Sequence, residues 1–370
     1  MNPFEFITRT PVWGLPIWKR YWLVLLAVFI CGSIDVLARR GCAQDFRQMA
    51  EEKFGKDSRI WFSEPGDRSL DRWEPRELFE DFGILLEWSE QNVVLVRPEA
   101  KSESTISGDT VVRIEPSWTS PAAEKIHRLF EQYQFQAVAA QGNEAIKLGG
   151  MPRWQQRVIL AEMIESRSAL GAPDAAGKLF SVLAKLNPPQ LLIATIPIPW
   201  GSETLDANLP KIQRLAEEWI LDENEAVQLM GAAWLLSGQK RASAIESLEN
   251  LAKNSKSQIL RSYAKAQLWR TTPPAELISD RYPKWLAERD SLLLPIQAGP
   301  TMLLAERLAQ AGQPVLAISE WLRIATLHAD RYHLASKAIL KAVAALRSLG
   351  RNEEAYKAEL LLKRYEIKTP

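Results

Sequence analysis

Beyond residue 118, apolar residues recur mostly three and four positions apart, which is the spacing of a helix that buries one face. Glycine or proline interrupts this pattern at short intervals, so each helix is followed by a break. Successive helices of this length with short connections are typical of stacked helical hairpins, and we predict a mainly α fold with an α-solenoid over residues 119–370. The expected helices span 122–140, 154–170, 175–186, 210–221, 223–236, 242–253, 258–269, 302–311, 315–327, 334–349 and 353–365.

Residues 44–118 have a different pattern, in which short runs of β-branched and aromatic residues alternate with polar stretches. We expect one helix over 44–54 and a polar loop, 98–109, that joins the last two strands as a hairpin. With 17 acidic and 10 basic residues this stretch carries a net charge of −7, and we predict a small acidic α+β module. The predicted strands span 59–62, 84–88, 92–97 and 110–114.

The leader, residues 1–43, contains an apolar run that ends at Arg39 and Arg40. As a helix, residues 21–38 would be about 27 Å long, close to the ~30 Å hydrocarbon core of a bilayer. Asp35 lies near one end of the run, where a charge costs much less than at the centre. We predict a single transmembrane anchor at about 21–38. A cleaved signal peptide and a buried core helix are the alternatives.

The orientation of this anchor is only weakly specified by charge. Three basic residues precede the apolar run and three follow it, so the positive-inside rule gives no preference. A short leader before one apolar segment is similar to an uncleaved signal. We therefore expect a single-pass membrane protein with the bulk of the chain outside the cytoplasm.

A glycine followed five residues later by a small residue recurs along the helical region. The four glycines are separated by 67, 74 and 38 residues, which corresponds to about two, two and one repeats of 34–40 residues. Phe180 and Trp321 stand nine residues after two of these glycines. The pairs are Gly171 with Ala176, Gly238 with Ser243, Gly312 with Ala317, and Gly350 with Ala355.

This pattern resembles the tetratricopeptide repeat, in which a glycine ends the first helix and a small residue in the second helix lets the two pack closely. The resemblance implies a concave surface that binds a partner protein or an extended peptide. Two features depart from the family: its Trp-x-x-Leu-Gly-x-x-Tyr start is absent, and Ser247 and Glu359 occupy the aromatic position after the other two glycines. Other helical-hairpin repeats remain open. The Pro-rich stretch 191–209 reads as an inserted loop.

Composition limits the kinds of chemistry. Lys and Arg number 46 against 45 Asp and Glu, so the chain is not a generally basic nucleic-acid binder. Cys31 and Cys42, the two cysteines, lie near the N-terminus and provide no disulfide framework for the rest. Fourteen tryptophans indicate large buried or interfacial surfaces but specify no reaction. We expect no cofactor, and the sequence leaves a small-molecule substrate undetermined.

Four local patterns are weak candidates for chemistry. Residues 171–178 resemble a phosphate-binding loop, but five residues separate the glycines and Leu179 replaces the metal-binding hydroxyl. Residues 262–265 match Ser-x-x-Lys without the other motifs of that enzyme class. The only local cluster of possible metal ligands has a spacing unsuited to one helix face, and a lone histidine in the first helix is better explained by packing. The cluster consists of His328, Asp330 and His333, and the lone histidine is His127. We assign no catalytic, cofactor-binding or metal residue.

Two further features suggest partner binding. A basic run offers a stripe for an acidic partner, although such runs are more often solvated faces. Trp200, in the Pro-rich break, is a candidate for lining a binding groove. The run consists of Lys253, Lys256, Arg261, Lys265 and Arg270.

We therefore expect a membrane-anchored helical-repeat scaffold that binds a protein or an extended peptide. The alternative is an extracytoplasmic hydrolase built on a helical toroid, as in some lytic glycosidases. That alternative requires an isolated buried carboxylate, for which Glu162 and Glu320 are the guesses.

Overall fold

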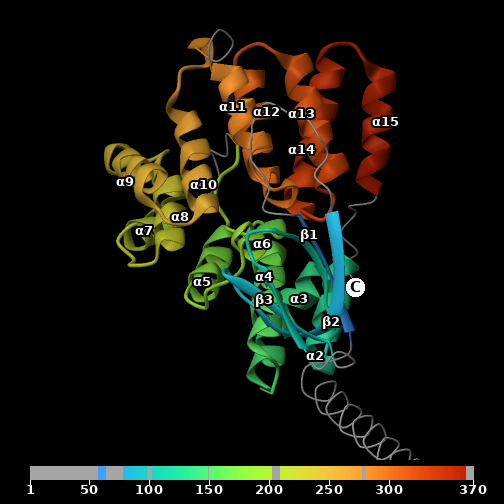
Figure 1. Ribbon diagram of the computed structural model, residues 1–370. Helices are drawn as coiled ribbons and strands as arrows, with labels where there is room; N and C mark the ends of the chain where they lie inside the picture. The colour runs from blue at the N-terminus through green and yellow to red at the C-terminus, as the bar shows by residue number, and fades with distance from the viewer. Residues whose placement is uncertain are drawn as a thin grey trace, which may run out of the picture.

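The computed structural model describes residues 57–63, 78–97, 102–148, 150–201, 209–276 and 281–363. The protein is mainly helical, with a five-stranded antiparallel sheet N-terminal to the helices (Figure 1). None of the helices within these ranges combines the length and the apolar character needed to span a bilayer. The predicted anchor at 21–38 and the predicted helix at 44–54 lie outside the described residues.

The sheet has the strand order β4-β3-β2-β1-β5, with each neighbouring pair antiparallel. The predicted polar loop 98–109 is wrong in part, because it contains β4. That strand has the sequence SESTIS and only Ile106 of it is buried, so it lacks the apolar run by which the other strands were recognised. The strands are β1 (Asp57–Ser63), β2 (Leu78–Trp88), β3 (Asn92–Arg97), β4 (Ser102–Ser107) and β5 (Val111–Glu115).

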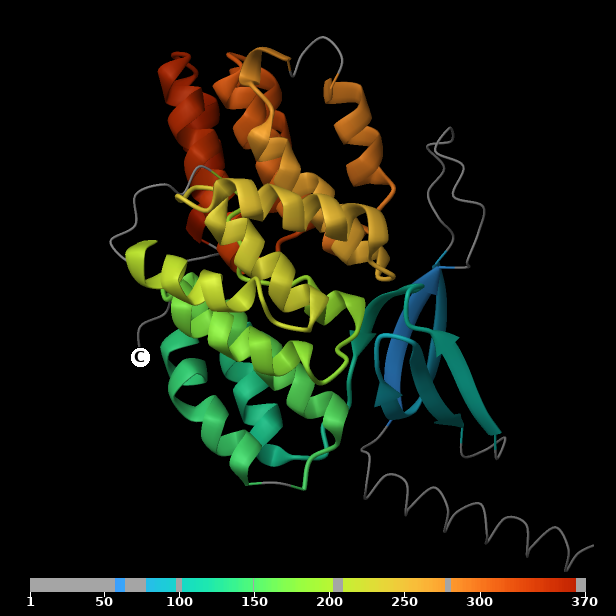
Figure 2. The same ribbon diagram turned by 90° about the vertical axis from the view of Figure 1, so that its left-hand side faces the viewer.

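The sheet lies beside the helices (Figure 2). It shares their buried core, which includes Ile60 and Leu85 from the strands. One arginine of α4 (Arg153–Ala169) connects the sheet to the helices through hydrogen bonds. The Arg157 guanidinium donates to the backbone oxygen of Trp88 at 2.5 Å and to that of Leu186 at 2.8 Å, and it also contacts the Glu87 carboxylate at 2.9 Å.

The helices stack in sequence order, from α2–α5 through α7–α10 to α12–α15 (Figure 2). Most begin and end within a few residues of the predicted bounds. The remaining helices are α2 (Pro121–Glu131), α3 (Phe135–Lys147), α5 (Pro173–Ala184), α6 (Gln190–Ile193), α7 (Leu209–Trp219), α8 (Glu225–Leu235), α9 (Arg241–Asn254), α10 (Gln258–Leu268), α11 (Tyr282–Asp290), α12 (Ala298–Gln310), α13 (Pro314–Leu327), α14 (Tyr332–Ser348) and α15 (Asn352–Leu362), with short 3₁₀ helices η3 (Trp269–Thr271), η4 (Pro274–Glu276) and η6 (Leu294–Ile296).

Four of the hairpins share one turn. In each, a residue with positive φ follows the first helix, and the next backbone N–H donates to the carbonyl five residues earlier at 2.9 Å, which is the Schellman arrangement. The residue five positions after each turn residue lies in the second helix and is buried. The turn residues are Tyr133, Gly171, Gly312 and Gly350, and the buried residues are Val138, Ala176, Ala317 and Ala355.

These turns correct the predicted repeat in two places. The single helix expected over 122–140 is wrong, because Tyr133 (φ 59°) divides it into α2 and α3. A glycine search misses this turn because a tyrosine makes it. Gly238 does not adopt a positive φ, and Ser243 after it is exposed. Ala244, one residue later, takes the buried position.

The turns at Tyr133 and Gly171 are 38 residues apart, and so are those at Gly312 and Gly350. The helical region therefore contains an N-terminal hairpin pair, α2–α5, and a C-terminal hairpin pair, α12–α15. The two pairs also touch directly. The Tyr332 ring, at the start of α14, lies 4.8 Å from that of Tyr133 and 4.6 Å from that of Phe135.

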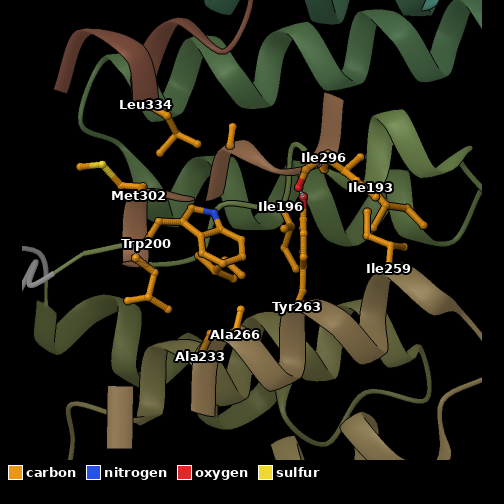
Figure 3. Close-up of a cluster of buried hydrophobic side chains, with 14 of the residues drawn as sticks. Ile193, Ile196, Trp200, Ala233, Ile259, Tyr263, Ala266, Ile296, Met302 and Leu334 are labelled. Atoms are coloured by element: carbon orange, nitrogen blue, oxygen red, sulfur yellow. Dashed lines mark hydrogen bonds between the residues drawn. The ribbon is translucent and has the colours of Figure 1, made fainter. Parts of the chain in front are cut away.

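The Pro-rich break fills the space between the layers of helices. Residues 192–201 are all buried, so the expectation of an inserted surface loop is wrong for this part of the break. The Trp200 ring packs nearly perpendicular to that of Tyr263 at 4.9 Å (Figure 3). Trp234 Nε1 donates to the backbone oxygen of Pro197 at 2.8 Å, and Gln267 Nε2 donates to that of Pro199 at 3.0 Å.

Candidate functional site

A pocket rich in arginine lies where the end of α8 and the start of α9 meet η3 and α12. Its cavity volume is about 180 Å³. Arg241 comes from the first position of α9, Arg270 from η3, and Arg307 from α12. We call this site the arginine pocket.

Backbone and side-chain oxygens hold these guanidinium groups in place. Arg270 donates to the backbone oxygen of Ala233 at 2.8 Å and to Ser237 Oγ at 2.8 Å. Arg307 donates to Gln310 Oε1 at 2.5 Å and also to the backbone oxygen of Thr272. Arg270 also donates to Gln267 Oε1 at 2.9 Å, and Arg241 donates to the backbone oxygen of Leu236 at 3.3 Å.

Among the described residues, no carboxylate lies within 4 Å of any of these three groups. Glu306 also lines the pocket, but its carboxylate pairs with Lys341 at 2.7 Å. Burial, together with the charges of Arg241 and Arg307, lowers the pKa of Arg270 to about 10. Burial also lowers the pKa of Arg307. The pocket is therefore a partly desolvated cluster of like charges.

A second buried polar site joins α2 to α4. His127 Nδ1 lies 2.5 Å from Glu162 Oε1, and the His127 ring lies 4.9 Å from that of Trp118. Burial opposes protonation of His127, but the hydrogen bond and charge of Glu162 outweigh it and raise the pKa of the imidazole. Burial raises the pKa of the Glu162 carboxyl, and His127 offsets part of that rise. The pair can hold and exchange one proton.

The other guessed carboxylate, Glu320, serves a different purpose. It forms an ion pair with Arg289, whose side chain is 2% exposed. Asp290 adds a second contact to Arg289 at 2.8 Å. An ion pair of this kind neutralises a buried guanidinium, so Glu320 is explained as the partner of Arg289 that links α13 to α11.

The histidines at the start of the last hairpin are separated rather than clustered. His328 is fully buried, whereas Asp330 is exposed. Burial and the nearby Arg331 lower the pKa of His328 and of His333 to about 4. Within the described ranges, no three His, Cys, Asp or Glu side chains gather as a metal ion would require.

The remaining sequence candidates are mostly structural. Gly171 makes a hairpin turn and the following residues begin α5, so residues 171–178 are a helix junction. Ser262 and Lys265 line a smaller pocket, with a cavity volume of about 50 Å³, on α10 beside Glu288 and Arg289. Trp200 is part of the core rather than of a groove.

The predicted basic stripe is divided by the fold. Three of its lysines are exposed on or near α9 and α10, and Arg261 donates to the backbone oxygen of Ser255 at 2.5 Å. Arg270 turns away from them into the arginine pocket. Arg241 and Arg307 carried no signal in the sequence, because each is a single arginine in an amphipathic helix. The exposed lysines are Lys253, Lys256 and Lys265.

No protein-family model matches the chain, and no curated protein or solved structure is significantly similar to it. The functional interpretation therefore rests on the geometry of the described residues.

Proposed function

We propose that the protein is a membrane-anchored helical-repeat interaction module with tetratricopeptide-like hairpins. The observation that carries this proposal is the recurrence of one hairpin turn at 38-residue spacing in two separate pairs. Repetition of one packing unit is how solenoid proteins build an extended binding surface. The anchor at residues 21–38 would raise the effective concentration of a bound partner at the membrane, with the helical region outside the cytoplasm.

The C-terminal hairpin pair is the most favourable interface for such a partner. Because the chain's own segment 192–201 fills the interior, the partner would contact an outer face. Large apolar side chains are exposed on helices α13 to α15, and Tyr356 and Leu360, four residues apart on α15, lie on one face of that helix as a small apolar patch. The exposed side chains are Val315, Leu316, Leu327, Leu340, Tyr356 and Leu360.

Co-purification of the tagged full-length protein from detergent-solubilised membranes tests this proposal. The variant Tyr356→Glu with Leu360→Glu places charges on this face, and Val182→Glu is the control, since Val182 is exposed on α5 of the N-terminal pair. We expect a stoichiometric partner with the wild type and the control that is lost with the double variant. Equal retention in all three would reject this face. Recovery of the folded protein alone would reject the scaffold.

The anchor has its own test. Deleting residues 1–43 should move the protein from the membrane fraction to the soluble fraction, while the co-purification surface on α15 stays intact. Protease treatment of sealed cells or vesicles should digest the helical region from the extracytoplasmic side. Protection from that side would reverse the proposed orientation.

The alternative proposal is a hydrolase, and one observation favours it. Glu162 is a buried carboxyl with a raised pKa beside His127, which suits a general acid. Neither of the two pockets described above is lined by Glu162. Hydrolysis of a polysaccharide by the purified protein, abolished by Glu162→Gln, would replace the scaffold proposal with this one.

A further inference from the structure

We propose that the arginine pocket binds a small oxyanion of the phosphate class, either free phosphate or the phosphate ester of an organic ligand. The inference does not depend on the scaffold function. It rests on the charge, the donors and the size of the pocket formed by Arg241, Arg270 and Arg307.

The first argument is the missing counter-charge. Elsewhere in the described part of the chain, strongly buried arginines face a carboxylate. In the arginine pocket, three guanidinium groups converge and none has a carboxylate within 4 Å among the described residues. Since burying uncompensated charge is unfavourable, a bound anion would stabilise this arrangement. The compensated pairs are Arg157 with Glu87, Arg289 with Glu320, and Arg331 with Glu165.

The second argument is the supply of donors. Arg307 is 8% exposed, and its Nε is buried with no hydrogen-bond partner among the described residues. Ser237 Oγ already accepts a hydrogen bond from Arg270, so its own proton is available to an anion. Guanidinium groups bind phosphate through two parallel hydrogen bonds, and Arg241, exposed and with one hydrogen bond to a carbonyl, keeps N–H groups for such contacts.

The third argument is the match of charge and volume. Glu306 in the pocket wall is offset by Lys341, so the three arginines leave a positive charge that suits a phosphate dianion better than a monovalent carboxylate. The cavity volume of the pocket is about 180 Å³, which leaves room for a phosphate group. The open side therefore admits the organic part of a phosphate ester.

The competing explanation is that these arginines cap backbone carbonyls. Arg270 donates to a carbonyl in the last turn of α8, Arg241 to the carbonyl of the residue that caps α8, and Arg307 to the carbonyl that follows η3. Cations at helix C-termini are stabilising without any ligand. This explanation predicts that phosphate has no specific effect on the protein, so the two can be separated.

The test is calorimetric titration of the full-length protein in detergent with inorganic phosphate, at constant ionic strength set by chloride. We expect saturable binding by the wild type, and at least tenfold weaker binding by Arg241→Gln. Arg241 is exposed and makes one hydrogen bond of 3.3 Å, so this variant keeps the fold. Arg153→Gln is the matched control, because Arg153 is exposed on α4 and the charge change is the same. Thermal unfolding checks that both variants are folded.

Titration with glycerol phosphate identifies the source of the phosphate group. Binding at least tenfold tighter than inorganic phosphate assigns a phosphate ester, and equal or weaker binding assigns free phosphate. Heat changes that follow ionic strength alone, or equal binding by Arg241→Gln and Arg153→Gln, would overturn the proposal.

Discussion

Two groups of buried arginines in the helical region differ in what neutralises them. Arg289 and Arg331 each contact a carboxylate from another helix, Glu320 in one case and Glu165 in the other. Arg270 and Arg307 contact backbone carbonyls and neutral side chains, with no carboxylate within 4 Å among the described residues. The charge of the first group is neutralised by carboxylates, whereas the second group retains an excess of positive charge.

The difference shows which buried charges call for a functional explanation. Moving a charged group out of water is unfavourable by several kcal/mol, so it persists when a partner offsets the loss. A paired arginine is explained by that partner. An unpaired cluster requires either solvent at an open mouth or a ligand, and the arginine pocket has the open mouth through which a ligand can enter.

Breaking the ion pair between Arg289 and Glu320 should have the largest effect on stability. Glu320→Ala leaves Arg289 buried with Asp290 as its remaining acidic contact, so we expect a loss of about 3–5 kcal/mol in the free energy of unfolding. Urea denaturation measures it. Glu359→Ala is the control, since its pair with Arg347 is exposed and should contribute less than about 1 kcal/mol. Equal effects would show that Arg289 remains hydrated.

The pKa of His328 is sensitive to the charges of the compensated arginines, Arg289 and Arg331. Burial and then Arg331, Arg323 and Arg289 lower its pKa to about 4. The unfolded chain binds a proton near pH 6.5 and the folded protein does not until about pH 4, so stability should be lost as pH falls through this range. The shift corresponds to roughly 3 kcal/mol.

Urea denaturation at pH 7, 6, 5 and 4 checks this window. In His328→Gln the loss of stability with falling pH should be smaller than in the wild type, though His333 has a similarly lowered pKa and keeps part of it. An unchanged slope would show that His328 is protonated in the folded protein.

Much of the fold was predictable from local signals. The spacing of apolar residues identified most helices, and the glycines at 171, 312 and 350 marked turns that require a positive φ. Tyr133 makes the same turn with a side chain that packs on Phe135 and Tyr332, so tertiary contacts replace the local preference there. Strand β4 was missed because its one buried side chain, Ile106, gives no pattern.

The candidate site was much less predictable. The arginine pocket combines residues from α9, η3 and α12, which lie up to 66 positions apart between Arg241 and Arg307. Of these three arginines, only Arg270 belongs to a feature visible in the sequence, the basic run that begins at Lys253. The lysines of that run lie on another surface. Glu162 and Glu320 were equivalent guesses in the sequence. Their partners distinguish them, a histidine for Glu162 and an arginine for Glu320.

The turn at Gly312 joins the helix that carries Arg307 to the helix that carries Glu320, so it tests whether the two groups are coupled. A Cβ at Gly312 meets no atom within 4 Å, and Gly312→Ala therefore adds only the strain of a positive φ, about 1–2 kcal/mol. Gly171→Ala has the same local geometry in the other pair and should cost the same. Urea denaturation compares them, and a much larger loss at Gly312 would show that this turn holds both arginine groups in place.

The smallest expected effect on stability is that of Arg241→Gln, in contrast to that of Glu320→Ala. In phosphate-free buffer, Arg241→Gln loses one exposed hydrogen bond of 3.3 Å and relieves repulsion with Arg270, so we expect a net change within about 0.5 kcal/mol. Because salt screens that repulsion, urea denaturation should find the variant relatively more stable in low salt than in high salt. A loss above about 1 kcal/mol at both salt concentrations would make Arg241 a structural cap of α8. The two arginine groups would then differ only in whether carboxylates or carbonyls satisfy them.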